Sequence, residues 1–305
     1  MTMIVGCAPD ERGKAALQLA AMLARSSGDD LVVCAVLPAP WIPGMARVDA
    51  EYQQQLDTEA DRTLDHAKSE IPDDVPARFV RHRARSVAVG LLELAQKHHA
   101  SLIVLGSSSA GALGHVVLGS VTDRLLHSSP VSLALAPRGY RCRPAHEVDR
   151  VTVAYGGGEA ESIVVAAAAI AVRLKASMRI ASFAVWSRPA YTTTLGTDPE
   201  DLVLEEWKST LGATVGESLA QVEGLADAPV DVETVVGHGQ AWGDAIEDIV
   251  WSDRDVLVVG SSELGPVAQV FIGSRASKIV RHSPVPVIVL PRARAEELAE
   301  KATTV

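Results

Sequence analysis

The chain carries one pattern twice, and this internal repeat limits its possible folds more than any other feature. The segment SLIVLGSSSAGALGHVVLGSVTDRLLHSSPVSLALAPR begins at Ser101, and DVLVVGSSELGPVAQVFIGSRASKIVRHSPVPVIVLPR begins at Asp255. Their glycines and prolines match at one constant spacing, without a gap: Gly106 with Gly260, Gly119 with Gly273, Pro130 with Pro284, and Pro137 with Pro291. A constant spacing of this kind indicates a duplicated structural unit.

The length of the chain agrees with one domain for each copy. Its 305 residues suit two domains of about 150 residues each. We expect a first domain over residues 1–140 and a second over residues 148–305. The stretch RGYRCRPAHEVD, residues 138–149, is predicted to be the polar linker between them.

Apolar, strand-like runs alternate with helical patterns in each copy. In the first copy we expect strands at residues 2–7, 31–37, 77–83, 101–106 and 131–136. In the second copy we expect them at residues 150–155, 178–186, 230–236, 255–260 and 285–290. Runs such as LIVL and VIVL are apolar throughout, which is typical of parallel strands covered by helices on both faces. The pattern predicts an open α/β sheet, whose ligands bind beyond the carboxyl ends of the strands.

The charge balance excludes some partners. With 28 Lys and Arg residues against 38 Asp and Glu residues, the formal net charge is −10. Because such a protein is repelled by nucleic acid and by anionic membranes, we expect neither as a partner. The start of the chain lacks the pattern of a signal peptide, and the longest apolar run, VVAAAAIAV, is too short to span a bilayer. We therefore expect a cytoplasmic protein.

The repeated segments resemble the universal stress protein family in its tandem two-domain form. The resemblance rests on the strand before each glycine loop, the helix starts LGSV and IGS, and the closing runs SPVSLALAP and SPVPVIVLP. It implies two flavodoxin-like (adenine-nucleotide alpha hydrolase-like) open parallel sheets with strand order 3-2-1-4-5. It also implies pairing through the fifth strands, in a homodimer or in a pseudo-dimer within the chain.

The family's ATP-binding members share a signature: Gly, two residues, Gly, nine residues, then Gly-Ser or Gly-Thr. An Asp that ends their first strand holds the adenosine end. The positions of the first copy that match this site are Ala8, Val36, Gly106, Ser109, Gly119, Ser120 and Val121. Ser109 replaces the middle glycine and Ala8 replaces the Asp. Asp10, two residues further on, can take the role of that Asp only if the loop is reshaped.

Magnitudes rank the two copies as nucleotide sites. If the middle position needs a positive φ, serine there costs roughly 1–2 kcal/mol, and the missing Asp contact costs roughly 1.5–3 kcal/mol. In the second copy Glu263 takes the middle position and Tyr155 the Asp position. A carboxylate about 4 Å from a phosphate oxygen repels it by roughly 4 kcal/mol at an effective dielectric of about 20. We expect ATP binding in the first copy only, and weakly.

Two hypotheses of function remain open from the sequence. The first is a stress-response binding protein with weak or vestigial ATP binding in its first domain. The alternative is a nucleotide-independent interaction or scaffold protein that keeps the fold for dimerisation, in which the glycines serve the turn alone. Neither copy shows an acid–base pair or an activated nucleophile at a recognisable spacing, so we expect no enzyme activity. His98 and His99 are adjacent and point to different faces of a helix, so we expect no metal site there.

A basic cluster surrounds the predicted third strand of the first copy, in the stretch ARFVRHRARS. Its members are Arg78, Arg81, His82, Arg83 and Arg85. The cluster is either an anion-binding patch or a set of charges that blocks pairing at a sheet edge, and we favour the second interpretation.

Overall fold

The structure is a computed structural model of the chain. It describes residues 1–39, 46–110, 112–143, 145–156, 161–185, 222, 228–229, 231–261 and 273–303. The first half contains β1 (Thr2–Gly6), α1 (Glu11–Ser27), β2 (Asp30–Pro38), α2 (Ala46–Glu70), β3 (Ala77–Ala84), α3 (Val87–Lys97), β4 (Ala100–Gly106), α4 (Ser120–Leu126) and β5 (Ser132–Ala136). The second half contains β6 (Arg150–Ala154), α5 (Glu161–Leu174), β7 (Ser177–Val185), β8 (Val232–Gly239), α7 (Trp242–Glu247), β9 (Asp255–Gly260), α8 (Ser274–His282), β10 (Val287–Leu290) and α9 (Arg292–Thr303).

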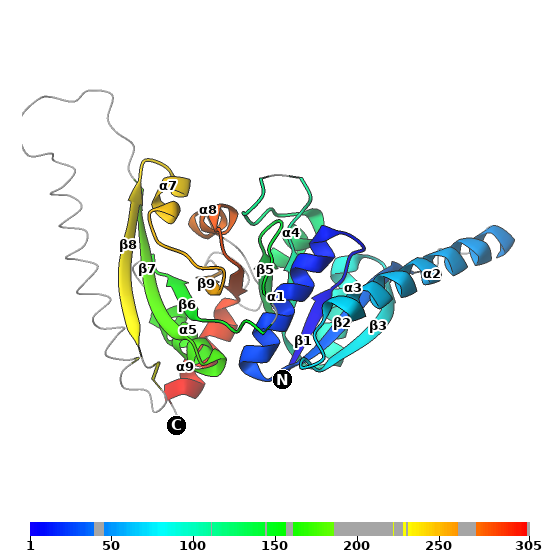
Figure 1. Ribbon diagram of the computed structural model, residues 1–305, viewed down its shortest axis with the longest axis horizontal. Helices are drawn as coiled ribbons and strands as arrows, with labels where there is room; N and C mark the ends of the chain where they lie inside the picture. Colours follow the sequence, from blue (N-terminus) through cyan, green and yellow to red (C-terminus); the bar gives the residue numbers. More distant parts are fainter. Residues whose placement is uncertain are drawn as a thin grey trace, which may run out of the picture.

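All described strands belong to one ten-stranded sheet with the order β3-β2-β1-β4-β5-β10-β9-β6-β7-β8. In Figure 1 this sheet crosses the molecule from β3 at one edge to β8 at the other. Within each half the strands pair in parallel and in the order 3-2-1-4-5, so the expected fold class is confirmed. β5 and β10 pair antiparallel, with Ala134 opposite Ile288. The two fifth strands thus join the halves within one chain.

Helices cover both faces of the sheet, as the doubly apolar strands predict. Helices α1, α2, α5 and α9 bury their apolar residues on one face, and α3, α4, α7 and α8 on the other. The core of the first face includes Val5 and Val153, and the core of the second includes Ile103 and Leu257. Because each cluster draws on both halves, the core continues across the seam between β5 and β10.

The linker between the halves packs along α1 instead of running through solvent. Tyr140 is buried, and its hydroxyl lies 3.1 Å from the backbone oxygen of Asp253 and 3.3 Å from Met22 Sδ. Near the other end of the linker, the Val148 backbone N–H donates to Ser26 Oγ at 2.8 Å. The prediction of a polar connection was therefore incomplete, because the linker also supplies apolar side chains that close the core between α1 and the second half.

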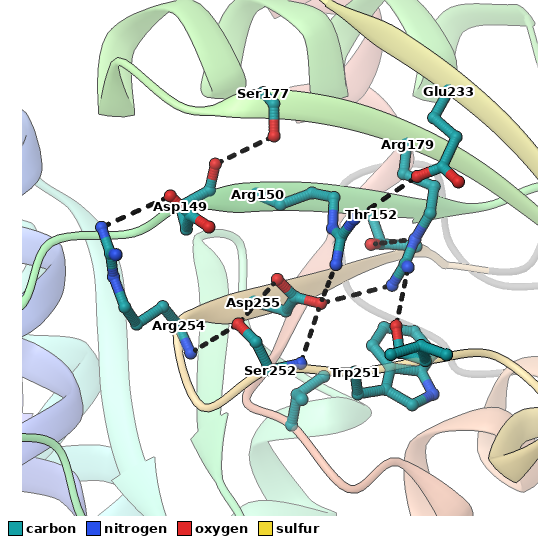
Figure 2. Close-up of polar contacts among 12 residues, drawn as sticks. Asp149, Arg150, Thr152, Ser177, Arg179, Glu233, Trp251, Ser252, Arg254 and Asp255 are labelled. Carbon is teal, nitrogen blue, oxygen red and sulfur yellow. Dashed lines mark hydrogen bonds and ion pairs between the residues drawn. The ribbon is translucent and has the colours of Figure 1, made fainter.

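A buried ion cluster lies at the amino ends of β6, β7 and β9 (Figure 2). Arg179 donates to Thr152 Oγ1 at 3.1 Å, to the Val250 backbone oxygen at 2.8 Å and to Asp255 Oδ2 at 3.4 Å. The side chain of Arg179 is 3% exposed and that of Asp255 is 0% exposed. The Arg179 guanidinium also lies over the ring of Trp251, 4.6 Å from its centre. Each of the three nitrogens of this buried guanidinium therefore has a partner.

The first half has an apolar layer at the equivalent place. In the pairing of β6 with β7 Thr152 lies opposite Arg179, and in the pairing of β1 with β2 Ile4 lies opposite Val32. Both Ile4 and Val32 are buried in the cluster beneath α3, a helix of 11 residues. Its counterpart α7 has only 6 residues. We attribute the ion cluster to this shorter helix, since a long side chain is needed to fill the space that it leaves.

Two arginines of the basic cluster on edge strand β3 pair with acids of α2. Arg83 Nη2 lies 2.7 Å from Asp57 Oδ1, and Arg81 Nη1 lies 3.3 Å from Asp61 Oδ2. His82 Nε2 lies 2.6 Å from Glu93 Oε2 on α3. These pairs agree with the interpretation of charges that protect a sheet edge.

Candidate functional site

The carboxyl ends of β1 and β4 lie side by side, at the point where the strand order reverses. Gly106 ends β4 at this point, directly against the first turn of α1. A Cβ atom on Gly106 would lie 2.1 Å from the backbone oxygen of Arg12. Only glycine allows this close approach of two backbones, so Gly106 has a structural requirement that holds with or without a ligand.

The loop after Gly106 is closed by its own hydrogen bonds. The buried Ser107 hydroxyl donates to the Ala136 backbone oxygen at 2.6 Å and accepts from the Val117 N–H at 3.0 Å. The Ser108 N–H donates to the Val117 backbone oxygen at 2.8 Å. These contacts join the outgoing and returning limbs of the loop. Ser107 and Ser108 therefore shape the loop, which leaves Ser109 as the serine available to a ligand.

Ser109 is exposed and does not adopt the conformation that glycine would favour. Among the described residues, the non-glycine positions with positive φ are His99, Ala145 and Lys175. Within the loop the left-handed conformation falls on Gly114, with a φ of 82°. Ser109 therefore does not carry the free-energy cost expected for a serine with positive φ. The loop makes a tight turn five residues later, at a glycine.

Gly119 brings the end of the loop back to its beginning. It is the N-cap residue of α4, with an extended backbone at a φ of −97° and no side-chain cap. A Cβ on Gly119 would lie 3.4 Å from Ser108 Cβ, which is ordinary van der Waals contact. Ser120 follows as the exposed first residue of α4, and Val121 packs partly buried against the core. The first-turn backbone N–H groups of α4 thus lie beside the serines of the loop, unsatisfied within the helix.

Ala8 lies in the connection between β1 and α1, where glycine again permits a close approach. A Cβ on Gly13 would lie 2.0 Å from the backbone oxygen of Ala8. Together with the contact of Gly106 on Arg12, this closeness brings Ala8 and Gly106 to the same turn of α1. Gly13 was not among the site residues predicted from the sequence. The signal that points to it is a glycine in the first turn of a helix, where helix propensity disfavours glycine.

Asp10 caps α1 and does not reach toward the loop. Its carboxylate accepts from the Arg12 backbone N–H at 3.0 Å and from Arg12 Nε at 2.7 Å. Burial acts to raise the pKa of Asp10, but the hydrogen bonds and charge of Arg12 outweigh it and lower the pKa below its usual value. The carboxylate is thus already committed to a helix start. It does not supply the contact that is lost at Ala8.

Val36 lies near the end of β2, opposite His82 of β3. A Cβ on Gly90 of α3 would lie 2.6 Å from Val36 Cγ1. Val36 is partly buried against the core, and its place is explained by the packing of α3 on β2. No described contact joins it to the glycine loop.

The second half keeps the frame of the site, with one correction to the alignment. The Tyr155 N–H donates to the Ala181 backbone oxygen, as the Cys7 N–H donates to that of Cys34. Since Ala181 and Cys34 hold equivalent places in the register, Tyr155 corresponds to Cys7, and Gly156 corresponds to Ala8. Placing Tyr155 in the Asp position was therefore wrong by one residue.

The glycine loop of the second half is described only at its ends. Gly260 ends β9, and the N–H of Ser261 donates to the Leu290 backbone oxygen at 2.9 Å. Gly273 is the N-cap residue of α8, with a φ of −69°. Glu263 lies outside the described residues, so its proposed repulsion of phosphate stays a prediction.

In the part of the chain that the structure describes, no group of three or more His, Cys, Asp or Glu residues is arranged to hold a metal ion. In the same residues, no helix combines the length and the apolar character that crossing a membrane requires.

The ten-stranded sheet and the two loops define a tandem α/β protein of the flavodoxin-like class, with a glycine loop after the fourth strand of each half. The model of the universal stress protein family matches residues 1–137 and 147–291. The chain therefore belongs to the universal stress protein family.

Relatives of the same length support this assignment. The chain is 37% identical over 301 residues to a curated universal stress protein of Mycobacterium tuberculosis, covering 95% of this chain and 100% of that protein. A universal stress protein of Mycobacterium bovis matches with the same values. Among solved structures, a universal stress protein from Archaeoglobus fulgidus aligns with a TM-score of 0.63 and 19% identity, covering 95% of this chain and 98% of that chain. That last likeness concerns the fold.

Proposed function

We propose that this universal stress protein binds an adenine nucleotide weakly at the loop of its first half, in the cytoplasm and without catalysing a reaction. The observation that carries the proposal is the meeting of Gly106, Ser108 and Gly119 at the carboxyl end of β4. Such a turn, followed directly by a helix start, presents backbone N–H groups to an anion.

The loop offers polar groups and little steric obstruction to a phosphate. Ser109 and Ser120 are both exposed, one on each limb of the loop. Gly119 has no side chain between them, and the N–H groups of the first turn of α4 need partners. These features support a phosphate contact made mainly by backbone.

The adenosine end explains why we expect the binding to be weak. With Ala8 in the Asp position and Asp10 held by Arg12, neither residue offers a free carboxylate for a charge-assisted hydrogen bond. Such a bond contributes about 1.5–3 kcal/mol, which corresponds to roughly ten- to a hundredfold in affinity. The substitution Ala8→Asp is therefore expected to strengthen ATP binding by about that factor.

The decisive experiment is calorimetric titration of ATP into the wild-type protein and two matched variants. Gly119→Val places a branched side chain between the limbs of the loop and should abolish binding. Because Gly119 has an extended backbone, valine there should not prevent folding. Gly273→Val, the same change at the equivalent N-cap of the second half, should leave ATP affinity unchanged.

The possible results separate the two hypotheses. Equal loss of binding in both valine variants would contradict a site confined to the first half. No binding in the wild type or in Ala8→Asp would favour the nucleotide-independent scaffold, and a concentration-dependent dimer in sedimentation would be its expected property. Release of ADP during the titration would contradict binding without turnover.

A further inference from the structure

A cavity lies between the two halves at the amino ends of β1, β4 and β5, whereas the glycine loop proposed above to bind nucleotide follows the carboxyl end of β4. Its volume is about 90 Å³. Its floor is formed by β1, β4, β5 and β10, which are four consecutive strands of the sheet, and its walls by α1, α5 and α9. The apolar side chains that line it include Leu23, Leu102, Ile170, Leu174, Ile288 and Leu298.

The repeat shows why this space is open. The constant spacing that matches Pro137 with Pro291 also matches Tyr140 with Arg294. In the first half Tyr140 is buried against Met22 and fills the corresponding space. Arg294 lines the cavity in its place. The same core position thus holds a buried tyrosine ring in one half and an arginine that lines a cavity in the other.

The helices next to Tyr140 and Arg294 also differ in the size of one side chain. α1 ends before the left-handed Gly28, and α5 ends before the left-handed Lys175. Aligning these two helix ends places Met22 opposite Ala169, which also lines the cavity. A small residue therefore replaces a large one on the helix, in addition to the exchange of the ring for an arginine.

The charged lining favours an anion. Two cations, Arg173 and Arg294, and one acid, Asp29, line the cavity. Arg173 bridges to Asp29 at 2.5 Å, which neutralises one cation. Arg294 lies 2.6 Å from Glu297 Oε2, and its side chain is 21% exposed. Glu297 does not line the cavity and also pairs with Lys301 at 2.6 Å, so Arg294, Lys301 and Glu297 together keep a net positive charge beside the cavity.

We propose that this cavity binds an alkyl carboxylate of short chain length. The apolar chain enters between α1, α5 and α9, and the carboxylate pairs with Arg294 at the rim. A chain of about four carbons suits the space, because a cavity that accommodates the six carbons of benzene has a volume of about 150 Å³. The site is independent of the glycine loop and of the proposed nucleotide binding.

The test is calorimetric titration of butanoate, with butanol as the uncharged probe of the same chain length. Butanoate is expected to bind with one site per chain. Between acetate and butanoate, each methylene that enters should strengthen binding about fourfold, the equivalent of about 0.8 kcal/mol per buried CH₂. Arg294→Gln should weaken butanoate at least tenfold and leave butanol within twofold. Lys97→Gln, which removes an exposed cation of α3 on the other face of the sheet, should change neither.

Two filling variants locate the ligand. Arg294→Tyr copies the residue that closes the first half, and Ala169→Met copies its neighbour on the helix. Each should abolish the binding of both probes, and the thermal midpoint of each variant shows whether it is folded. Undiminished butanoate binding in a folded filling variant would overturn the proposal. So would the absence of butanoate binding to the wild type at millimolar concentration.

Discussion

Removing the Asp255 carboxylate is the sharpest test of how the second half is held together. Asp255 is 0% exposed and lies 3.0 Å from Arg150 Nη2 and 3.4 Å from Arg179 Nη2. It also accepts from the Ser252 N–H at 3.2 Å and from the Ser252 hydroxyl at 3.1 Å. Figure 2 shows its contacts with both arginines, and Asp255→Ala leaves Arg179 charged and buried without its acid.

The expected cost follows from burial. Burial already lowers the pKa of Arg179, and the charge of Arg150 lowers it further, against the opposing effect of Asp255 and Glu233. Breaking a buried ion pair by removing one partner typically costs about 3–5 kcal/mol. Arg150 is 26% exposed and can turn toward water, so most of the cost falls on Arg179. Against a total stability of roughly 5–15 kcal/mol, this loss is large.

The matched control replaces both partners by apolar residues. Arg179→Met with Asp255→Val removes the buried charges together and keeps a long side chain beneath Trp251. Such replacements are often neutral or stabilising, so we expect the double variant to unfold within about 1 kcal/mol of the wild type. Urea unfolding, followed by tryptophan fluorescence and circular dichroism, measures both differences.

Two results would refute this reasoning. A cost below about 1 kcal/mol for Asp255→Ala would mean that Arg179 is effectively solvated. A double variant as unstable as Asp255→Ala would mean that packing or the lost hydrogen bonds to Ser252, and not the unpaired charge, determine the loss.

Three further predictions concern the glycine loop, the first helix and the linker. Gly106→Ala should lower the thermal midpoint strongly, because its Cβ would lie 2.1 Å from a backbone oxygen. Gly260→Ala should leave the thermal midpoint nearly unchanged, because its Cβ would lie 3.5 Å from its nearest neighbour. Asp10→Ala should cost about 1 kcal/mol of unfolding free energy as a lost helix cap. Because the folded pKa of Asp10 is lowered, its contribution to stability is present above the unfolded pKa and disappears as pH falls through the folded pKa. The stabilities of the variant and the wild type should therefore converge in acid. Tyr140→Phe removes a buried hydroxyl 3.1 Å from a backbone oxygen and should cost about 1 kcal/mol in urea unfolding.

The sequence by itself determined the features that depend on local pattern and on repetition. The matched glycines and prolines predicted two copies of one unit, and the doubly apolar strands predicted a parallel sheet with helices on both faces. The frame of Gly106, Gly119 and Ser120 predicted a turn that enters a helix. These predictions succeed because strand burial and turn geometry are recorded in residues close together in the chain.

Tertiary structure alone decided the features that depend on distant partners. The role of Gly106 depends on Arg12, and that of Asp10 on the helix that it caps. The one-residue correction at Tyr155 came from hydrogen-bond register, since two neighbouring positions after a strand look alike in sequence but point to opposite faces. The exchange of Tyr140 for Arg294 is visible as letters in the repeat. Its consequence, a filled core on one side of the seam and an open cavity on the other, arises only when the two halves pack together and every side chain competes for the same volume.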